Sequence, residues 1–504
     1  MDVASRRHSV RTCHDSSMAE TKESTASKPG LDGYFRIAAR GSSIGREVRG
    51  GLTTFLTMVY IVVLNPVILG WVPDKTGHYL GGGTEPGSGL VAIATATALV
   101  AGLMTILMGA WARFPLAVAA GLGINGFVAY GLVGSGKLTW EQAMGLIVLE
   151  GLLVLILVLT KLRVKFLIAI PMALKKAIAA GIGLFLAFIA FWDSKVVHDP
   201  GAEFDPTPSE FGTGGFITSW TLVVFFFGVF LAGILLVKKV KGALLYSIIA
   251  STVLAFIIEA IHPQAWGLNV PSFSGREFKP LQFDTIFHID LFGAFSEGAG
   301  VGFVSALLLV FSLLVVDFFD TMGTMTAVGE EAELNDDEGI PENSQEILIV
   351  DSISAVAGGL GGVSSNTSYI ESASGVGDGA RTGLASVVTG IAFLLTMFVT
   401  PLAQVVPHEA ATPVLVIVGL MMLRGAIDID WRDYRIAVPA FLTIVIMPMG
   451  YSIAAGIGVG FIAYVVINAF TGKLKEIKPL MWIGAAAFVV YFALPGLQKL
   501  FGIE

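Results

Sequence analysis

The sequence predicts an all-α polytopic membrane protein with about fourteen transmembrane segments. Its composition is the first reason, because 54% of the 504 residues are hydrophobic and 14% are charged, whereas soluble proteins carry about 25% charged residues. The second reason is the recurrence of apolar segments of about 20 residues, the length that crosses a bilayer as a helix. The third is the clustering of basic residues in the short loops between these segments. Together these features exclude a soluble globular domain.

Seven apolar segments are expected in each half of the chain. In the first half they lie at residues 52–72, 90–111, 117–133, 141–160, 168–192, 218–236 and 242–261. In the second half they lie at residues 300–321, 346–361, 367–379, 381–403, 411–424, 435–449 and 451–470, and an eighth apolar segment follows at 480–500. An odd number of crossings inverts the second half relative to the first, as in secondary transporters built from inverted repeats.

The segments imply four parts. Residues 1–33 are rich in Ser, Thr and Lys and are expected to form a disordered cytoplasmic tail. Residues 34–262 form the first inverted repeat, 263–297 an extracytoplasmic loop and 298–502 the second inverted repeat. Basic residues at 36–49, 113, 161–165 and 238–241 fall on one side if every segment crosses. Because short cytoplasmic loops are enriched in Lys and Arg, the N-terminus is expected in the cytoplasm, while the side of the C-terminus stays open.

The third and tenth segments, 117–133 and 367–379, are short and rich in Gly, Ser and Asn. They are expected to be discontinuous, with half-helices whose N-termini approach each other near the middle of the membrane. The alternative is that these glycines only allow close helix packing. The string at 121–126 matches GxGxxG, but that motif indicates dinucleotide binding only after a strand in a soluble βαβ unit.

Two acids occur in the eighth segment, Asp317 and Asp320. Residues three apart share a helix face, and Thr321 extends the polar stripe. A charged side chain in a membrane segment persists when it faces a cavity, a partner or a substrate, so these acids indicate the working centre of a transporter. Asp317 is the deeper of the two and the first candidate for substrate contact. In the alternative, the segment ends at Val316 and both acids are solvated.

A third acid, Glu371, follows Ser368 in the tenth segment. It is either a ligand group or an ordinary carboxylate in the first turn of a helix, where the helix dipole stabilises it. In the third segment Asn125 offers both a donor and an acceptor. Glu150 in the fourth segment is either a proton relay or a partner for a neighbouring helix.

Five strings resemble the AzgA-like branch of the nucleobase:cation symporter-2 family, which contains purine permeases. They are TTFLTMVYIVVLNP at 53–66, GLGINGFVAY at 121–130, VDFFDTMGT at 316–324, TSYIESASGV at 367–376 and PAFLTIVIMP at 439–448. The resemblance covers about residues 34–500. It implies the UraA-like fold of two inverted seven-segment repeats, with core and gate domains, and often a homodimer. The stretch at 361–366 departs from the family pattern, which leaves the identity of the base less secure than the class.

The resemblance implies a plasma-membrane symporter that imports purine nucleobases of the adenine, guanine and hypoxanthine class together with a proton. The substrate-binding residues carried over or expected are Asp317, Glu371, Asn125, Ser368 and Thr321, and the proton-coupling residues are Asp317, Asp320 and Glu371. No metal, cofactor or nucleic acid is expected, and the single cysteine, Cys13, excludes an internal disulfide. The partners are the purine, the proton and membrane lipid.

Other functions compete with this expectation. An anion transporter of the same architecture would need a positive site. An intramembrane aspartyl protease would use Asp378 of the Gly-x-Gly-Asp string at 375–378 together with Asp317, although Asp378 stands at the end of a segment. A cation channel would need a symmetric acidic ring, which two different acidic segments do not provide.

Overall fold

The protein is described by a computed structural model. The structure describes residues 30–160, 170–199, 209–213, 215–263, 266, 270–273, 278–279, 281–296, 301–336 and 340–501, and of residues 494–501 only the backbone. The predicted tail lies outside the described residues up to residue 29. In the described part of the chain, ten helices are long and apolar enough to cross a membrane. The predicted all-α polytopic class is therefore confirmed.

The elements follow the chain in two halves. The first half contains α1 (Leu31–Phe35), α2 (Ile44–Met58), α3 (Ile61–Leu69), α4 (Leu90–Leu107), η1 (Met108–Ala112), β1 (Val118–Ala120), α5 (Leu122–Gly126), η2 (Phe127–Val133), α6 (Trp140–Leu159), α8 (Met172–Asp193), β2 (Val197–His198), β3 (Glu210–Phe211), α9 (Trp220–Val237) and α10 (Ala243–Ile261). The second half contains η3 (Gly293–Phe295), α11 (Phe303–Glu331), α12 (Ser344–Gly361), β4 (Asn366–Ser368), α13 (Ser372–Gly377), α14 (Gly383–Thr396), η4 (Met397–Val405), α15 (His408–Ala411), α16 (Pro413–Leu423), η5 (Arg424–Asp428), α17 (Tyr434–Met449), α18 (Ile453–Phe470), η6 (Leu474–Glu476) and α19 (Pro479–Phe501).

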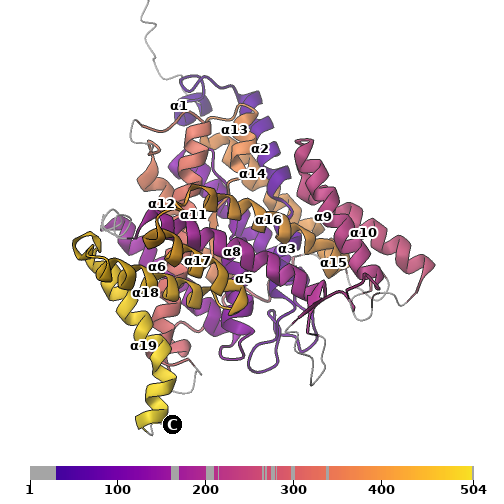
Figure 1. Ribbon diagram of the computed structural model, residues 1–504. Helices are drawn as coiled ribbons and strands as arrows, with labels where there is room; N and C mark the ends of the chain where they lie inside the picture. The colour runs from indigo at the N-terminus through magenta and orange to yellow at the C-terminus, as the bar shows by residue number, and fades with distance from the viewer. Residues whose placement is uncertain are drawn as a thin grey trace, which may run out of the picture.

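The helices pack as two groups, each drawn from both halves of the chain. In the core group, α6 packs on α12, and α4 and α2 pack on α14, with α3, α5, α11 and α13 beside them. In the gate group, α8 packs on α16 and α17, α17 on α18, and α9 on α10 and α16. Figure 1 shows α9 and α10 at one edge of the molecule and α19 leaving it at another. Exchange of equivalent helices between the halves is expected of inverted repeats.

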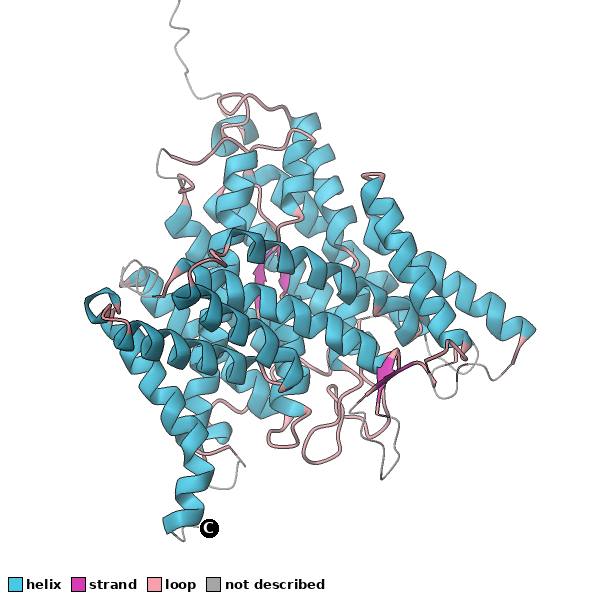
Figure 2. Cartoon of the chain, in the orientation of Figure 1, coloured by secondary structure: helices cyan, strands magenta, loops and turns pink. Residues whose placement is uncertain are grey.

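A two-stranded antiparallel pair lies among the helices near the centre of the molecule (Figure 2). β1 pairs with β4 in the register Val118↔Ser368, Ala119↔Thr367 and Ala120↔Asn366. Each strand leads into a short helix, α5 or α13. The predicted discontinuity of the third and tenth segments is therefore confirmed, and the strand pairing between them adds to it.

The pairing provides hydrogen-bond partners for backbone groups of the two extended segments inside the membrane. Backbone groups in the hydrocarbon region have no water to bond, so they need partners in the protein. The ladder continues beyond the strands, because the Tyr369 N–H donates to the Ala117 carbonyl at 2.9 Å and the Gly121 N–H to the Ser365 carbonyl at 2.9 Å. The Thr105 hydroxyl bonds both the N–H and the carbonyl of Val118.

Two helix boundaries differ most from the predicted ones. The first segment begins at Ile44 rather than 52, because Glu47 is buried and accepts hydrogen bonds from the backbone N–H groups of Arg381 and Thr382. These contacts make a polar stretch compatible with the core. The eighth segment continues to Glu331, ten residues past the predicted end at 321. Asp317 therefore lies mid-helix and is fully buried, which excludes a solvated Asp317 after a helix end.

Basic residues from distant parts of the chain gather at one face, as the loop pattern predicted. Arg40 donates to the carbonyls of Arg113 and Arg381, and Lys241 forms an ion pair with Asp378. The predicted basic loop at 161–165 lies outside the described residues.

Glycines allow helix α14 to lie close to α4 and to η1, which continues α4. A Cβ placed on Gly390 would lie 2.5 Å from the Gly102 carbonyl oxygen, and one on Gly109 would lie 2.3 Å from the Gly383 carbonyl oxygen. Such small-residue contacts let membrane helices approach closely.

We expect Gly390→Ala to lower the melting temperature of the detergent-solubilised protein, because overpacking of this kind costs about 1–3 kcal/mol. Gly233→Ala in α9 is the matched control, since a Cβ there meets no atom within 4 Å. The control should melt at or above the temperature of the parent. Equal melting temperatures for Gly390→Ala and the parent would show that the two helices do not pack this closely.

Candidate functional site: a cavity between the core and gate groups

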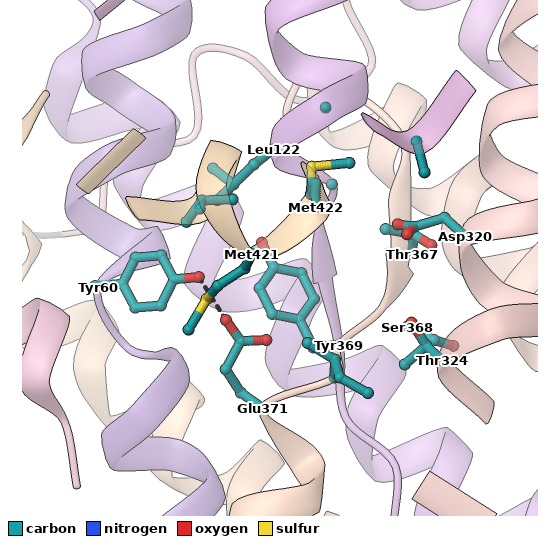
Figure 3. A pocket seen from close by; sticks show the side chains of 15 residues that line it. Tyr60, Leu122, Asp320, Thr324, Thr367, Ser368, Tyr369, Glu371, Met421 and Met422 are labelled. Atoms are coloured by element: carbon teal, nitrogen blue, oxygen red, sulfur yellow. Dashed lines mark hydrogen bonds between the residues drawn. The ribbon is translucent and has the colours of Figure 1, made fainter. Parts of the chain in front are cut away.

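A cavity of about 230 Å³ lies where the central strands meet the gate group. Its lining residues come from both groups: Tyr60, Gly121, Leu122, Gly123, Asp320, Thr324 and Thr367–Glu371 from the core group, and Ala179, Val418, Met421 and Met422 from the gate group. Figure 3 shows these side chains around the space they enclose. The two walls differ in chemistry, because the core side is polar and the gate side is apolar.

The polar wall carries two carboxyl groups, Asp320 on α11 and Glu371 before α13. Asp320 is exposed to the cavity and lies beside the Thr367 hydroxyl (Figure 3). Glu371 accepts a hydrogen bond from the Tyr60 hydroxyl at 2.8 Å, which joins the first and tenth segments. Among the described residues that line the cavity, none is basic. The wall therefore offers hydrogen-bond acceptors to a ligand that carries N–H groups.

Glu371 does not act as an ordinary helix cap. It occupies the N-cap position of α13, but no side-chain hydrogen bond caps that helix. Its Oε1 atom bonds Tyr60 instead. The Glu371 side chain therefore bonds Tyr60 and does not cap α13 through a hydrogen bond.

The apolar wall consists of gate-group side chains from α8 and α16, with Val418, Met421 and Met422 supplied by α16. Methionine is unbranched and polarisable, so it adapts to a flat surface. A planar ligand with polar edges could place its face on these side chains and its edge on the acids. Because the two walls belong to different helical groups, relative motion of the groups would open or close the cavity.

Asp317 lies outside the cavity although it is three residues from Asp320. Both of its carboxyl oxygens are buried without a hydrogen-bond donor, and its carboxyl faces that of Glu150 within hydrogen-bonding reach. Asp351 on α12 lies nearby, where it accepts hydrogen bonds from the hydroxyls of Thr321 and Ser368, each at 2.8 Å. The structure thus separates two acids at the cavity from three behind it.

The other predicted binding residues divide in the same way. Ser368 lines the cavity, but its hydroxyl donates a hydrogen bond to Asp351. The Thr321 hydroxyl also donates to Asp351, and Thr321 does not line the cavity. Asn125 is fully buried away from the cavity lining. Its amide donates to the Asn65 Oδ1 atom at 2.6 Å, and Asn65 in turn donates to the Thr97 hydroxyl. Asn125 therefore holds the third segment against the first.

Sequence reasoning missed Tyr60, Asp351 and the methionines of the gate group. Asp351 had a usable signal, because it is an acid inside an apolar segment. Tyr60 had no such sequence signal, since a tyrosine in a membrane segment can serve packing or hydrogen bonding in many positions. The protease hypothesis fails on contacts: Asp378 forms an ion pair with Lys241 and accepts a hydrogen bond from Thr53, so it is neutralised at the basic face.

The chain matches a known protein family and is similar to several permeases. The Permease family model Xan_ur_permease matches residues 45–459. The adenine permease AdeP of Escherichia coli is 35% identical over 462 residues, which cover 91% of this chain and 95% of that protein. The guanine/hypoxanthine permease PbuG of Bacillus subtilis is 37% identical over 467 residues, which cover 91% of this chain and 98% of that protein.

Among solved structures, the transmembrane domain of the cyanobacterial bicarbonate transporter BicA aligns with a TM-score of 0.58 at 16% sequence identity. The alignment covers 82% of this chain and 97% of that domain. At this identity the likeness concerns the fold alone. The family match over residues 45–459 and the relatives that share about a third of their residues with nearly the whole chain establish that this protein belongs to the Permease family, whose members are membrane transporters rather than enzymes.

Proposed function

We propose that the protein imports purine nucleobases across the plasma membrane together with protons, and that it binds the base between Asp320 and Glu371. The observation that carries this proposal is the cavity with two carboxyl groups on one wall and methionines on the other. A purine is flat, has N–H donors along its edge and is apolar on its faces. Carboxylates accept such N–H groups in charge-assisted hydrogen bonds.

In this proposal, the residues of the polar wall have separate roles in binding the base. Tyr60 occupies Oε1 of Glu371 and leaves Oε2 for the base. Asp320 supplies a second acceptor on the same polar wall. The relatives named as adenine and guanine/hypoxanthine permeases support a purine rather than another planar ligand.

Proton coupling is proposed from the acids. Buried carboxyl groups are costly as anions inside a membrane, so an exchangeable proton is a natural co-substrate. The cavity supports Asp320 and Glu371 as base-binding groups, and its lining leaves Asp317 for proton coupling. The basic face that contains Arg40, Arg113 and Lys241 is proposed to be cytoplasmic, following the enrichment of Lys and Arg on that side. The N-terminal helix α1 would lie there too.

Uptake of radiolabelled adenine, guanine and hypoxanthine into cells that lack purine transport tests the proposal. Unlabelled purines should compete, uracil and sulfate should not, and a protonophore should abolish accumulation. Inhibition by sulfate or bicarbonate without inhibition by any purine would favour the anion transporter instead.

We expect Glu371→Gln and Asp320→Asn to weaken purine binding by about ten- to a hundredfold, because losing a charge-assisted hydrogen bond costs about 1.5–3 kcal/mol. Competition by unlabelled base measures the apparent affinity. Glu330→Gln is the matched control, since Glu330 is an exposed acid at the end of the same helix as Asp320. Parent-like affinity in both cavity variants would refute the site.

A pair of Tyr→Phe changes separates binding from stability. Tyr60→Phe should weaken purine binding by roughly two- to tenfold, because about 0.5–1.5 kcal/mol of support for Glu371 is lost. Tyr34 in α1 donates its hydroxyl to the Ala110 carbonyl at 2.6 Å and does not line the cavity, so Tyr34→Phe should lower the melting temperature and leave affinity near that of the parent. The opposite pattern would exclude Tyr60 as the residue that positions Glu371.

A further inference from the structure

We propose that Glu150 and Asp317 share one proton outside the cavity, and that this shared proton is the one carried with the substrate. The inference rests on the proposed function, since it assigns the proton of that symport to a particular pair. Glu150 belongs to α6 and Asp317 to α11. Neither side chain lines the cavity.

The burial and the donorless oxygens of the two carboxyl groups fit a shared proton. Both side chains are fully buried, and they face each other within hydrogen-bonding reach. Neither oxygen of Asp317 has a donor, and Oε1 of Glu150 has none. Two carboxylates are acceptors only, so a hydrogen bond between them forms only when one carries a proton. With one proton the pair has a single negative charge, and without it two charges repel in a buried site.

Asp351 provides the contrast within the same region. One of its oxygens accepts the Thr321 hydroxyl and the other accepts the Ser368 hydroxyl. Each of its oxygens therefore has a hydroxyl donor, and hydroxyl donors stabilise the ionised form. Among these three acids, Glu150 and Asp317 are therefore the ones with carboxyl oxygens that lack a donor.

The surrounding charges favour keeping the proton. The acids close enough to act on Asp317 are Glu150 on α6, Asp351 on α12 and Asp320 on the same helix. Within the described ranges, no lysine, arginine or histidine forms an ion pair with Glu150, Asp317 or Asp351. The negative charge of these acids is therefore offset by a bound proton and not by a basic side chain.

The segment around β4 connects the pair to the cavity. The Ser365 hydroxyl donates to the Oε2 atom of Glu150 at 3.4 Å, and the Ser365 carbonyl accepts the Gly121 N–H at 2.9 Å. Gly121 and Thr367 line the cavity. A base that shifts this segment would change the distance from Ser365 to Glu150, which gives substrate binding a path to the shared proton.

Two transport assays on purified protein in lipid vesicles test the inference. Exchange of labelled for unlabelled purine at equal pH on both sides moves no net proton, whereas accumulation driven by an imposed pH gradient requires coupling. We expect Glu150→Gln to retain exchange and to lose gradient-driven accumulation. Glu150→Asp should keep part of the accumulation, and Glu330→Gln, with an exposed acid removed, should match the parent in both assays.

Several results would overturn the inference while leaving purine transport intact. They are parent-like accumulation in Glu150→Gln, loss of exchange together with accumulation in that variant, and accumulation by the parent on a sodium gradient alone. Failure of the parent to exchange any purine would instead refute the proposed function.

A measurement on the parent keeps the inference testable if Glu150→Gln does not fold. Infrared difference spectra recorded with and without purine at neutral pH should contain the band of a buried protonated carboxyl group, sensitive to deuterium exchange. The band should shift in Glu150→Asp. Absence of any such band in the parent would contradict a shared proton.

Discussion

The antiparallel pairing of β1 with β4 is the interaction on which the rest of the structure depends. It lets two stretches of extended backbone lie inside the membrane, where unpaired N–H and carbonyl groups are costly. Because each half of the chain supplies one strand, the pairing also holds the two inverted repeats together. Side chains next to the strands then reach in several directions: Thr367 to the cavity, Ser368 to Asp351 and Ser365 to Glu150. The cavity proposed to bind the base and the acids behind it are thus anchored to one short segment.

The division between core and gate groups gives the cavity its two kinds of wall. The polar wall stays with the core group, whose helices approach closely through glycine contacts. The apolar wall belongs to α8 and α16 of the gate group. Contacts between the groups include the Tyr130 hydroxyl donating to Asp193 at 2.6 Å and Lys175 over the ring of Phe319 at 4.5 Å. Alternating access requires such contacts to break and reform while the core group keeps the acids in place.

The sequence predicted the class, the inverted halves and the discontinuous third and tenth segments, because apolar length, segment count and small-residue composition are local signals. It also identified the region of the acids. It placed Asp317 before Asp320 for substrate contact, whereas Asp320 lines the cavity; the two side chains lie on one helix and differ by roughly 60° of rotation. That angle decides whether a carboxyl group meets the cavity or Glu150, and it depends on how the neighbouring helices pack.

Long-range partners were the other gap. Asn125 and Thr321 have side chains suited to ligand binding, yet Asn125 donates to Asn65 and Thr321 to Asp351. Pairing of this kind is fixed by tertiary contact rather than by residue type. The boundary at Ile44 was missed for the same reason, since buried Glu47 bonds a backbone more than three hundred residues away.

A structure of the protein with a purine bound, determined by electron cryomicroscopy, would show directly whether the base binds between Asp320 and Glu371. We expect the edge of the base within hydrogen-bonding distance of Asp320 and Glu371, with its ring face against Met421 and Met422. We also expect Asp317 to stay opposite Glu150 without touching the base. A purine bonded directly to Asp317 or Asn125, or bound away from the central strands, would contradict the account.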